Sequence, residues 1–265
     1  GLVDQSWTGD AAPFDYDSDG WIDLYVLSMQ GNDEIYRNVG GERFEKVSRK
    51  VFPKTSWGAM GIQIFDFDND GRQDVFVTDM HSDMSQGETP DKEKAKADIQ
   101  WGEEMLETGG ASLFGNAFYR SLGEGKYEEI SDKIGAENYW PWGLSSGDLN
   151  ADGFADVFIT SSMNFPFRYG VNSLLLNVGG KRFADCEFVL GVEPRRGGRT
   201  AKPWFRVDPQ GEDGGNKYVE ELELKEPTEI WGAVGSRSSA IFDLDNDGDL
   251  DVVTNEFHDG PMVLR

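Results

Sequence analysis

One nine-residue pattern occurs four times in this chain and constrains its fold more than any other feature. The copies begin at Asp15, Asp66, Asp148 and Asp243, and they read DYDSDGWID, DFDNDGRQD, DLNADGFAD and DLDNDGDLD. A strongly β-prone segment follows each copy: LYVLS, VFVTD, VFITS and VVTNE. Self-similarity of this kind is typical of repeat architectures, so the repeat has to be recognised before single elements are assigned.

Each repeat carries signals for four short strands. A first strand, with Trp7, Trp57, Trp142 or Trp231 near its start, leads into the aspartate loop, and the β-prone segment after the loop is the second strand. The third strand reads DEIYRN, NAFYRS, NSLLLN and GPMVLR. A glycine turn then leads to a fourth strand, GGERFEKVS, GEGKYEEIS or GGKRFADCE, which the last copy lacks. Four short antiparallel strands per repeat are typical of a propeller blade, so we predict an all-β fold, a β-propeller of four-stranded antiparallel blades with the aspartate loops between first and second strands.

The spacing of the motifs predicts the organisation of the chain. Successive motifs start 51, 82 and 95 residues apart, and the first interval is close to the length of a bare blade. We therefore predict one propeller segment over 1–265, with blades at about 6–50, 56–132, 141–188 and 231–265 and insertions at about 80–115 and 188–230. Helix formers after Pro90 predict a helix ending near Gly109, and the alternation in KYVEELELK predicts an extra strand.

The number of blades predicts that this ring has further parts. About four blades are visible, three of them with all four strands and the last with three. A propeller ring needs at least four blades. We therefore expect the chain to be part of a larger ring, completed by further blades or by another chain.

The aspartate loops have the composition of calcium sites. Calcium takes six to eight oxygen ligands, and a tight loop brings carboxylates at alternate positions toward one point. Side chains at positions 1, 3, 5 and 9 and the backbone carbonyl of position 7 are the predicted ligands. They are Asp15, Asp17, Asp19, Trp21 and Asp23; Asp66, Asp68, Asp70, Arg72 and Asp74; Asp148, Asn150, Asp152, Phe154 and Asp156; and Asp243, Asp245, Asp247, Asp249 and Asp251. About four Ca²⁺ ions are expected, and Asn150 makes the third site the weakest because it removes one charge.

Two other interpretations of the loops fit less well. An EF-hand loop needs a bidentate glutamate at position 12 and flanking helices, whereas this chain has Val26, Val77, Ile159 and Thr254 there, each in a β-prone run. A metal-free turn rich in aspartate and glycine is common in proteins. Four near-identical copies at equivalent points of a repeat, with carboxylates that would repel one another, favour bound cations instead.

Charge and cysteine content exclude several classes of partner. The chain has 49 acidic and 25 basic residues and a net charge of −24, so nucleic acid and anionic membrane surfaces would be repelled. Cys186 is the only cysteine, which excludes an intrachain disulfide and a cysteine-based zinc or redox site. No apolar run approaches the roughly 20 residues that a membrane-spanning helix needs, so no membrane insertion is expected.

These motifs resemble the FG-GAP/VCBS repeats of integrin-type propellers, which carry DxDxDGxxD calcium loops between the first two strands of a blade. The chain is most similar to the ASPIC/UnbV and cartilage acidic protein group, through its aspartate loops, the DEIYRN and NSLLLN strands and the segment WGAVGSRSSAIFDLDNDGDLDVVTNEF. The resemblance implies an extracellular, cell-surface or periplasmic propeller without catalytic activity, used for adhesion or assembly.

Two classes of function remain open at this point. The first is a calcium-stabilised scaffold module that binds a protein or a glycan, and the second is a segment of a propeller enzyme such as a polysaccharide lyase or a glycan hydrolase. Catalysis needs a base or nucleophile with its partner in a pocket. The chain has only two histidines, His81 and His258, and it shows no nucleophile motif or nucleotide fingerprint, so we predict no enzyme activity.

Strand direction predicts which face would meet a partner. The first strand of each blade runs into its loop, so all four loops should lie on one face, and both insertions on the other. The two histidines and the basic cluster of Arg195, Arg196, Arg199 and Lys202 should lie with the insertions. The cluster is either a docking point for an acidic partner or ordinary solvated surface. A lectin interpretation depends on the aromatic residues Trp101, Tyr139, Trp140 and Trp204, which core packing explains equally well.

Overall fold

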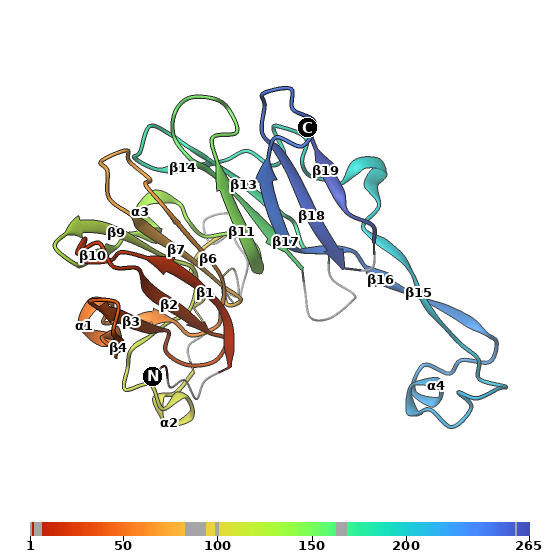
Figure 1. Cartoon of the computed structure of the whole chain (residues 1–265). Coiled ribbons are helices and arrows are strands. Elements are labelled where there is room, and N and C mark those ends of the chain that lie inside the picture. Colours follow the sequence, from red (N-terminus) through yellow and green to blue (C-terminus); the bar gives the residue numbers. More distant parts are fainter. Residues whose placement is uncertain (1, 3–6, 83–93, 99–100, 163–168, 258) are drawn as a thin grey trace.

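Four small antiparallel sheets follow one another along the chain in the computed structural model (Figure 1), which confirms the predicted all-β propeller arrangement. The structure describes residues 2, 7–82, 94–98, 101–162, 169–257 and 259–265. Blade 1 contains β1 (Thr8–Phe14), β2 (Asp23–Ser28), β3 (Glu34–Val39) and β4 (Arg43–Lys46). Blade 2 contains β6 (Ala59–Phe65), β7 (Asp74–Asp79), β9 (Ala117–Gly123) and β10 (Lys126–Glu129). Blade 3 contains β11 (Pro141–Gly147), β12 (Asp156–Ser161), β13 (Ser173–Asn177) and β14 (Phe183–Asp185). Blade 4 contains β17 (Gly235–Phe242), β18 (Asp251–Phe257) and β19 (Met262–Leu264).

The remaining elements connect or decorate the blades. Two further pairs of strands are the parallel pair β5 (Thr55–Ser56) and β8 (Ser112–Leu113), and the antiparallel pair β15 (Ala201–Val207) and β16 (Thr228–Ala233). The helices are α1 (Ser48–Val51), α2 (Glu103–Leu106), α3 (Ser131–Ile134), α4 (Lys217–Glu221) and the 3₁₀ turn η1 (Arg196–Gly198). Among the described residues no helix has the length and apolar character required to cross a membrane.

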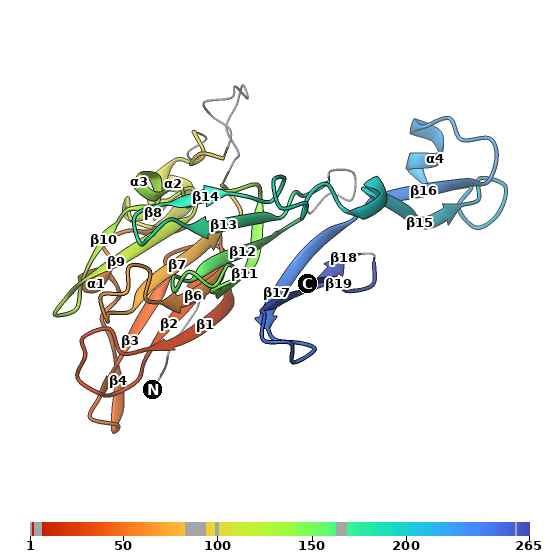
Figure 2. The same ribbon diagram turned by 90° about the horizontal axis from the view of Figure 1, so that it is seen from above.

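The blades pack through their first strands and through their faces. β1, β6, β11 and β17 contact one another in that order, so the first strand of each blade lies beside the first strand of the next (Figures 1 and 2). Side chains of a strand alternate between the two faces of its sheet. We call the face of a blade that meets the following blade its front face, and the face that meets the preceding blade its back face.

Large aromatic side chains on front faces fill the space between blades. Between blades 1 and 2, Phe14 and Tyr25 of the front face share a core with Val75, Val77 and Tyr119 of the back face. The same pattern continues along the chain: Phe76 and Phe118 meet Val157, Ile159 and Leu175 between blades 2 and 3, and Phe158 and Leu174 meet Val252 between blades 3 and 4. Burial of these side chains supplies the main favourable free energy for holding neighbouring blades together.

A buried polar side chain ties the second and third strands at equivalent points of three blades. Asn116 and Asn172 accept hydrogen bonds from the backbone N–H groups of Asp79 and Ser161, at 2.8 and 2.9 Å. Blade 1 has Asp33 there instead, which accepts from Ser28 N at 2.8 Å and from the Tyr25 hydroxyl at 2.9 Å. Asp33 is fully buried, and this burial raises the pKa of its carboxyl well above the ordinary value.

Asp33→Asn is expected to stabilise the protein at neutral and alkaline pH by on the order of 1 kcal/mol. Because the folded-state pKa of Asp33 lies above the unfolded value, the stability that this carboxyl contributes is present below pH 3.8 and is lost as pH rises through the folded pKa. An amide of the same shape avoids that loss, and blades 2 and 3 already use it. Denaturant unfolding at pH 5 and pH 8, with Asp10→Asn as the exposed control, measures the effect. A midpoint for Asp33→Asn below that of the unmodified protein at pH 8 would contradict the prediction.

The extra strand predicted at KYVEELELK is wrong, and so is the prediction that Trp231 belongs to the first strand of blade 4. The segment KYVEELELK forms no strand; its first five residues are α4, where the Asn216 side chain accepts from Tyr218 N at 3.0 Å and Val219 is buried. The extra strands are instead β15 and β16, which pair with each other, so Trp231 lies on β16 outside the blade 4 sheet. Because strand pairing depends on a partner, alternation alone did not identify which segments pair.

The helix predicted between Pro90 and Gly109 is reduced, in the part that the structure describes, to the single turn α2. The Glu103 carboxylate accepts from the Thr108 hydroxyl and from Gly109 N, and Glu107 takes a left-handed conformation with φ of 54°. These bonds turn the chain back directly after the helix. Residues 83–93 and 99–100 lie outside the described part, and so does the predicted helix start.

Candidate metal centre

The four aspartate loops share one backbone conformation. We call them loop 1 (15–23), loop 2 (66–74), loop 3 (148–156) and loop 4 (243–251). Position 4 of each loop is left-handed, with φ between 57° and 60°, and the glycine at position 6 has φ between 83° and 100°. Glycine adopts such positive φ values without strain, and its presence in all four loops explains why they turn alike.

Hydrogen bonds inside each loop hold the first aspartate in place. Its two carboxylate oxygens accept from the backbone N–H groups of positions 5 and 6; in loop 1, Asp15 accepts from Asp19 N at 3.1 Å and from Gly20 N at 2.9 Å. The equivalent pairs of bonds in loops 2, 3 and 4 measure 2.8–3.2 Å. This arrangement follows from the local sequence, because donor and acceptor lie within five residues of each other.

The aspartate at position 9 is buried and links the loop to its blade. In loop 2, Asp74 accepts from Phe67 N at 2.9 Å and from Ser121 N on β9 at 2.7 Å. Asp23 and Asp156 make the equivalent two bonds, and Asp251 accepts from Leu244 N at 2.8 Å. A carboxylate oxygen has two lone pairs, so these bonds still leave capacity for a metal.

Burial raises the pKa of Asp74 to about 6, and hydrogen bonds from the Ser121 and Phe67 N–H groups oppose the rise. The nearby charges of Asp68 and Asp70 raise it further. Burial likewise raises the pKa values of Asp23 and Asp156. Carboxylates held this close disfavour one another's ionised form, and a bound cation would reverse that cost.

An arginine of the third strand pairs with the aspartate at position 3 of loops 1 and 2, and Arg265, directly after β19, lies beside the same position of loop 4. In loop 1, Arg37 of β3 pairs through Nε with Asp17 Oδ2 at 2.8 Å, and in loop 2, Arg120 of β9 pairs with Asp68 Oδ2. The other oxygen of each carboxylate, Oδ1, is buried and has no hydrogen-bond donor. A buried carboxylate oxygen without a donor is costly. The Oδ1 atom can therefore bind a cation, and the arginine paired with Oδ2 orients the carboxylate for this contact.

Loop 3 lacks this arrangement. Leu176 occupies the position of Arg37 and Arg120 on its third strand, as the equivalent strand registers show. The side chain of Asn150 is folded onto Asp152: its Oδ1 accepts from Asp152 N at 3.0 Å and its Nδ2 donates to Asp152 Oδ2 at 3.1 Å. Loop 3 thus differs from loops 1 and 2 in geometry as well as in charge.

Carboxylate oxygens converge in three loops. One oxygen from each of three residues lies within 4.8 Å of the others in loops 1, 2 and 4; the sets are Asp15, Asp17 and Asp19; Asp66, Asp68 and Asp70; and Asp243, Asp245 and Asp251. Within the described part of the chain, no such set forms in loop 3, where the residue at position 3 is an amide. Two further kinds of ligand remain predictions. They are the Asp247 carboxylate and the position 7 carbonyls, which belong to Trp21, Arg72, Phe154 and Asp249.

The arginines beside the loops were not predicted from the sequence. Three arginines occupy one equivalent position at the third strand of their blades: Arg37, Arg120 and Arg265. Arg265 Nη1 lies 3.3 Å from Asp245 Oδ2 in loop 4. Both DEIYRN and NAFYRS contain a YR pair, which repeats the arginine in two blades. Only the register of the third strand shows that this arginine reaches the loop aspartate. Arg72, predicted to offer a carbonyl, also forms an ion pair with Asp70 through its side chain.

Hydrogen bonds join loop 1 to loop 2 and loop 2 to loop 3, so these three loops lie on one face of the propeller. Gln73 of loop 2 accepts from Asp15 N of loop 1 at 3.1 Å, and Asn69 Nδ2 of loop 2 donates to Gly153 O of loop 3 at 2.8 Å. In Figure 1 the connections that form loops 2, 3 and 4 appear along the upper edge of the blades, whereas α2 lies at the lower edge.

Several other candidate residues are engaged inside the fold. His81 is buried, and its Nδ1 lies 2.7 Å from Asp79 Oδ1. Its ring packs beside those of Trp57 and Phe114. His258 lies outside the described residues. Tyr139 and Trp140 are half-buried, whereas the side chains of Trp101 and Trp204 are exposed.

The basic cluster is divided by the fold. Arg195 is buried, where it pairs with Glu256 and donates to Ser236 Oγ at 2.8 Å. Lys202 pairs with Asp259, and Arg199 Nη2 lies 3.8 Å from the same carboxylate. Nothing is described of the Arg196 side chain. The buried Arg195 cannot contact a partner in this conformation. Of the other described members, Arg199 is exposed and Lys202 is partly buried.

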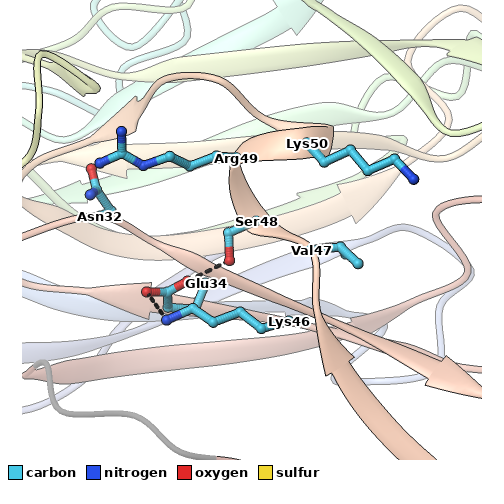
Figure 3. A pocket seen from close by; sticks show the side chains of 7 residues that line it. All are labelled: Asn32, Glu34, Lys46, Val47, Ser48, Arg49 and Lys50. Atoms are coloured by element: carbon cyan, nitrogen blue, oxygen red, sulfur yellow. Dashed lines mark hydrogen bonds and ion pairs between the residues drawn. The ribbon is translucent and has the colours of Figure 1, made fainter.

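A hollow at the outer end of blade 1 is lined by seven residues (Figure 3): Asn32, Glu34, Lys46, Val47, Ser48, Arg49 and Lys50. Hydrogen bonds among its polar groups connect β3 to α1. Lys46 Nζ lies 2.5 Å from Glu34 Oε1, and the Ser48 hydroxyl donates to Glu34 while accepting from Ile35 N at 3.0 Å. The Ser48 hydroxyl therefore has a structural role in the folded chain.

Comparison with known proteins agrees with the repeat geometry. The family model of the FG-GAP-like repeat matches residues 15–77 and 107–159, which include loop 1, loop 2 and loop 3. The chain therefore contains FG-GAP-like repeats in blades 1 to 3. No curated protein matches the chain significantly.

Proposed function

We propose that this chain is a calcium-stabilised, non-catalytic β-propeller module that binds a protein or glycan partner outside the cell, at the cell surface or in the periplasm. Each aspartate loop would hold one Ca²⁺ ion, about four in all. Within the FG-GAP-like repeats, the ASPIC/UnbV and cartilage acidic protein group is the proposed affiliation, through the motifs of the aspartate loops and third strands.

One observation carries the calcium proposal. Asp17 and Asp68 each have one oxygen paired with an arginine and the other buried without a donor. Such an oxygen requires a cation or solvent, and the converging carboxylates beside it make a hard divalent cation the best fit.

The partner surface is proposed on the face opposite the loops. Connections on a rigid scaffold commonly carry binding functions. In the described part of the first insertion, Trp101 and Met105 are exposed at 43% and 69% of their surface, and Trp204, Phe205 and Trp231 are exposed on the β15–β16 hairpin. Exposed aromatic side chains are common anchors for protein and glycan ligands.

Calcium titration by isothermal calorimetry tests this function and the ranking of the sites. We expect binding of about four ions, with the weakest affinity in loop 3. Asn150→Asp adds a charged ligand, and Leu176→Arg adds the arginine that loops 1 and 2 have. The double variant is expected to raise the affinity of the weakest site by roughly tenfold, which corresponds to about 1.4 kcal/mol.

Leu176→Arg alone is the matched control, because it adds the arginine without a carboxylate for it to orient. It is expected to leave loop 3 weak. An absence of calcium heat together with an absence of bound metal by elemental analysis would refute calcium binding. Equal or weaker affinity in the double variant would refute the ranking alone.

A further inference from the structure

The front face of blade 4 is uncovered, although the same face is buried in the other three blades. On this face Ala240, Val253 and Val263 are neighbours across β17, β18 and β19, and Phe242 follows on β17. The equivalent set in blade 1 is Ala12, Tyr25, Ile35 and Phe14, given by the same register relative to the loop. The register therefore shows what kind of surface each blade presents to its successor.

The exposed fractions differ sharply between these equivalent positions. Phe242 is 42% exposed, whereas Phe14 is 1% exposed. Val263 is 45% exposed, whereas Ile35 and Phe118, its counterparts in blades 1 and 2, are at 0%. Apolar side chains arranged like those of a blade interface, but accessible to water, indicate an interface without its second half.

The complementary surface lies at the other end of the propeller segment. Blades 2, 3 and 4 each present a back face with residues one and three positions after the last loop aspartate: Val75 and Val77, Val157 and Ile159, Val252 and Thr254. In blade 1 the equivalent residues are Leu24 and Val26, beside Ala11 and Pro13 on β1. Leu24 and Val26 are partly exposed, and Ala11 and Pro13 are exposed.

Blade 1 and blade 4 do not cover each other's faces. First strands contact in the series β1, β6, β11 and β17, and no comparable packing joins β17 to β1 among the described residues. Figures 1 and 2 show β1 and β17 at opposite ends of this series. One chain thus carries both halves of a blade interface at separate places.

We propose that two copies of this chain associate head to tail, with the front face of blade 4 of one copy packed on the back face of blade 1 of the other. A second copy fits the uncovered face because its blade 1 has the residue pattern that every front face in this fold already contacts. Such a heterologous contact gives a ring where its rotation closes, and an open filament where it does not. The proposal does not depend on calcium binding, since none of the apolar side chains named on the two faces is a predicted metal ligand.

Salt dependence separates this contact from a polar one. Each copy carries a net charge of −24, so two copies repel each other over long range. Salt screens this repulsion within about 8 Å at physiological ionic strength, while apolar contact is retained. Association through these faces is therefore expected to strengthen between 0.05 and about 0.5 M NaCl, whereas docking through Arg199 and Lys202 would weaken.

Analytical ultracentrifugation over a range of protein concentrations tests the proposal. The unmodified chain is expected to form dimers or larger rings, and Val263→Asp and Val26→Asp should each abolish this assembly. A mixture of the two variants should form a one-to-one dimer and nothing larger, because each retains one intact face. Phe205→Asp on the hairpin, an exposed aromatic outside both faces, is the control and should assemble normally.

Circular dichroism of each variant shows whether it folds. If Val26→Asp does not fold, Ala11→Asp, on the same face and exposed, replaces it. A chain that stays monomeric at every concentration and salt, variants that assemble like the unmodified chain, or a mixture that stays monomeric would each overturn the proposal. A monomeric chain with an intact calcium response would leave the proposed function standing while refuting this inference.

Discussion

Removal of calcium is expected to lower the melting temperature of this protein by roughly 20 °C, the largest effect that we predict. Each ion that binds only the folded state adds about 2.7 kcal/mol when calcium is present at 100 times its dissociation constant. Four sites together would exceed 10 kcal/mol by that relation, and about 1 kcal/mol shifts the melting temperature of a chain of this size by roughly 2–4 °C. The buried, donor-free oxygens of Asp17 and Asp68 lose their ligand on chelation, which adds to the loss.

Thermal melts with 2 mM calcium and with excess chelator provide the measurement. The variant Asp17→Asn/Asp68→Asn should melt lower in calcium and lose part of the difference between the two conditions. Glu124→Gln, an exposed acidic residue outside the loops, is the matched control and should behave like the unmodified protein. Coincident melts of the unmodified protein in both conditions would show that the loops do not stabilise the fold through calcium.

Phe118→Ala is expected to destabilise the protein by about 3–5 kcal/mol, the usual range for removing a buried aromatic side chain. Phe118 is fully buried on the front face of blade 2. Its ring centroid lies 5.1 Å from that of Phe67, 5.4 Å from that of Phe76 and 6.1 Å from that of Phe183, so the cavity would open in the middle of the interface with blade 3. A cavity surrounded by several rings collapses only in part, which places the cost toward the upper end of the range.

Denaturant unfolding in saturating calcium measures this effect without interference from the metal sites. Phe205→Ala removes an aromatic ring of the same size from the exposed hairpin, and it is expected to change the free energy of unfolding by less than about 0.5 kcal/mol. Equal losses for the two substitutions would mean that the interface between blades 2 and 3 is not a main source of stability.

The sequence by itself determined the parts of this protein that depend on short-range chemistry. The loops turn alike because glycine at position 6 and an aspartate at position 1 act within a few residues, as in the bonds from Asp19 and Gly20 to Asp15. The second, third and fourth strands were predictable for a related reason. Their β-prone runs are bounded by glycine turns, and the fourfold repetition identifies them as blades.

The tertiary structure decided which residues from different strands meet. The pairing of Arg37 with Asp17, and the absence of its counterpart at Leu176, depends on the register between second and third strands, which no single segment encodes. The same holds for KYVEELELK, whose alternation suits a strand but finds no partner, because β15 pairs with β16 instead. Burial is also decided at this level: Phe14 and Phe242 follow the same local pattern, and their exposure differs because a following blade covers only Phe14.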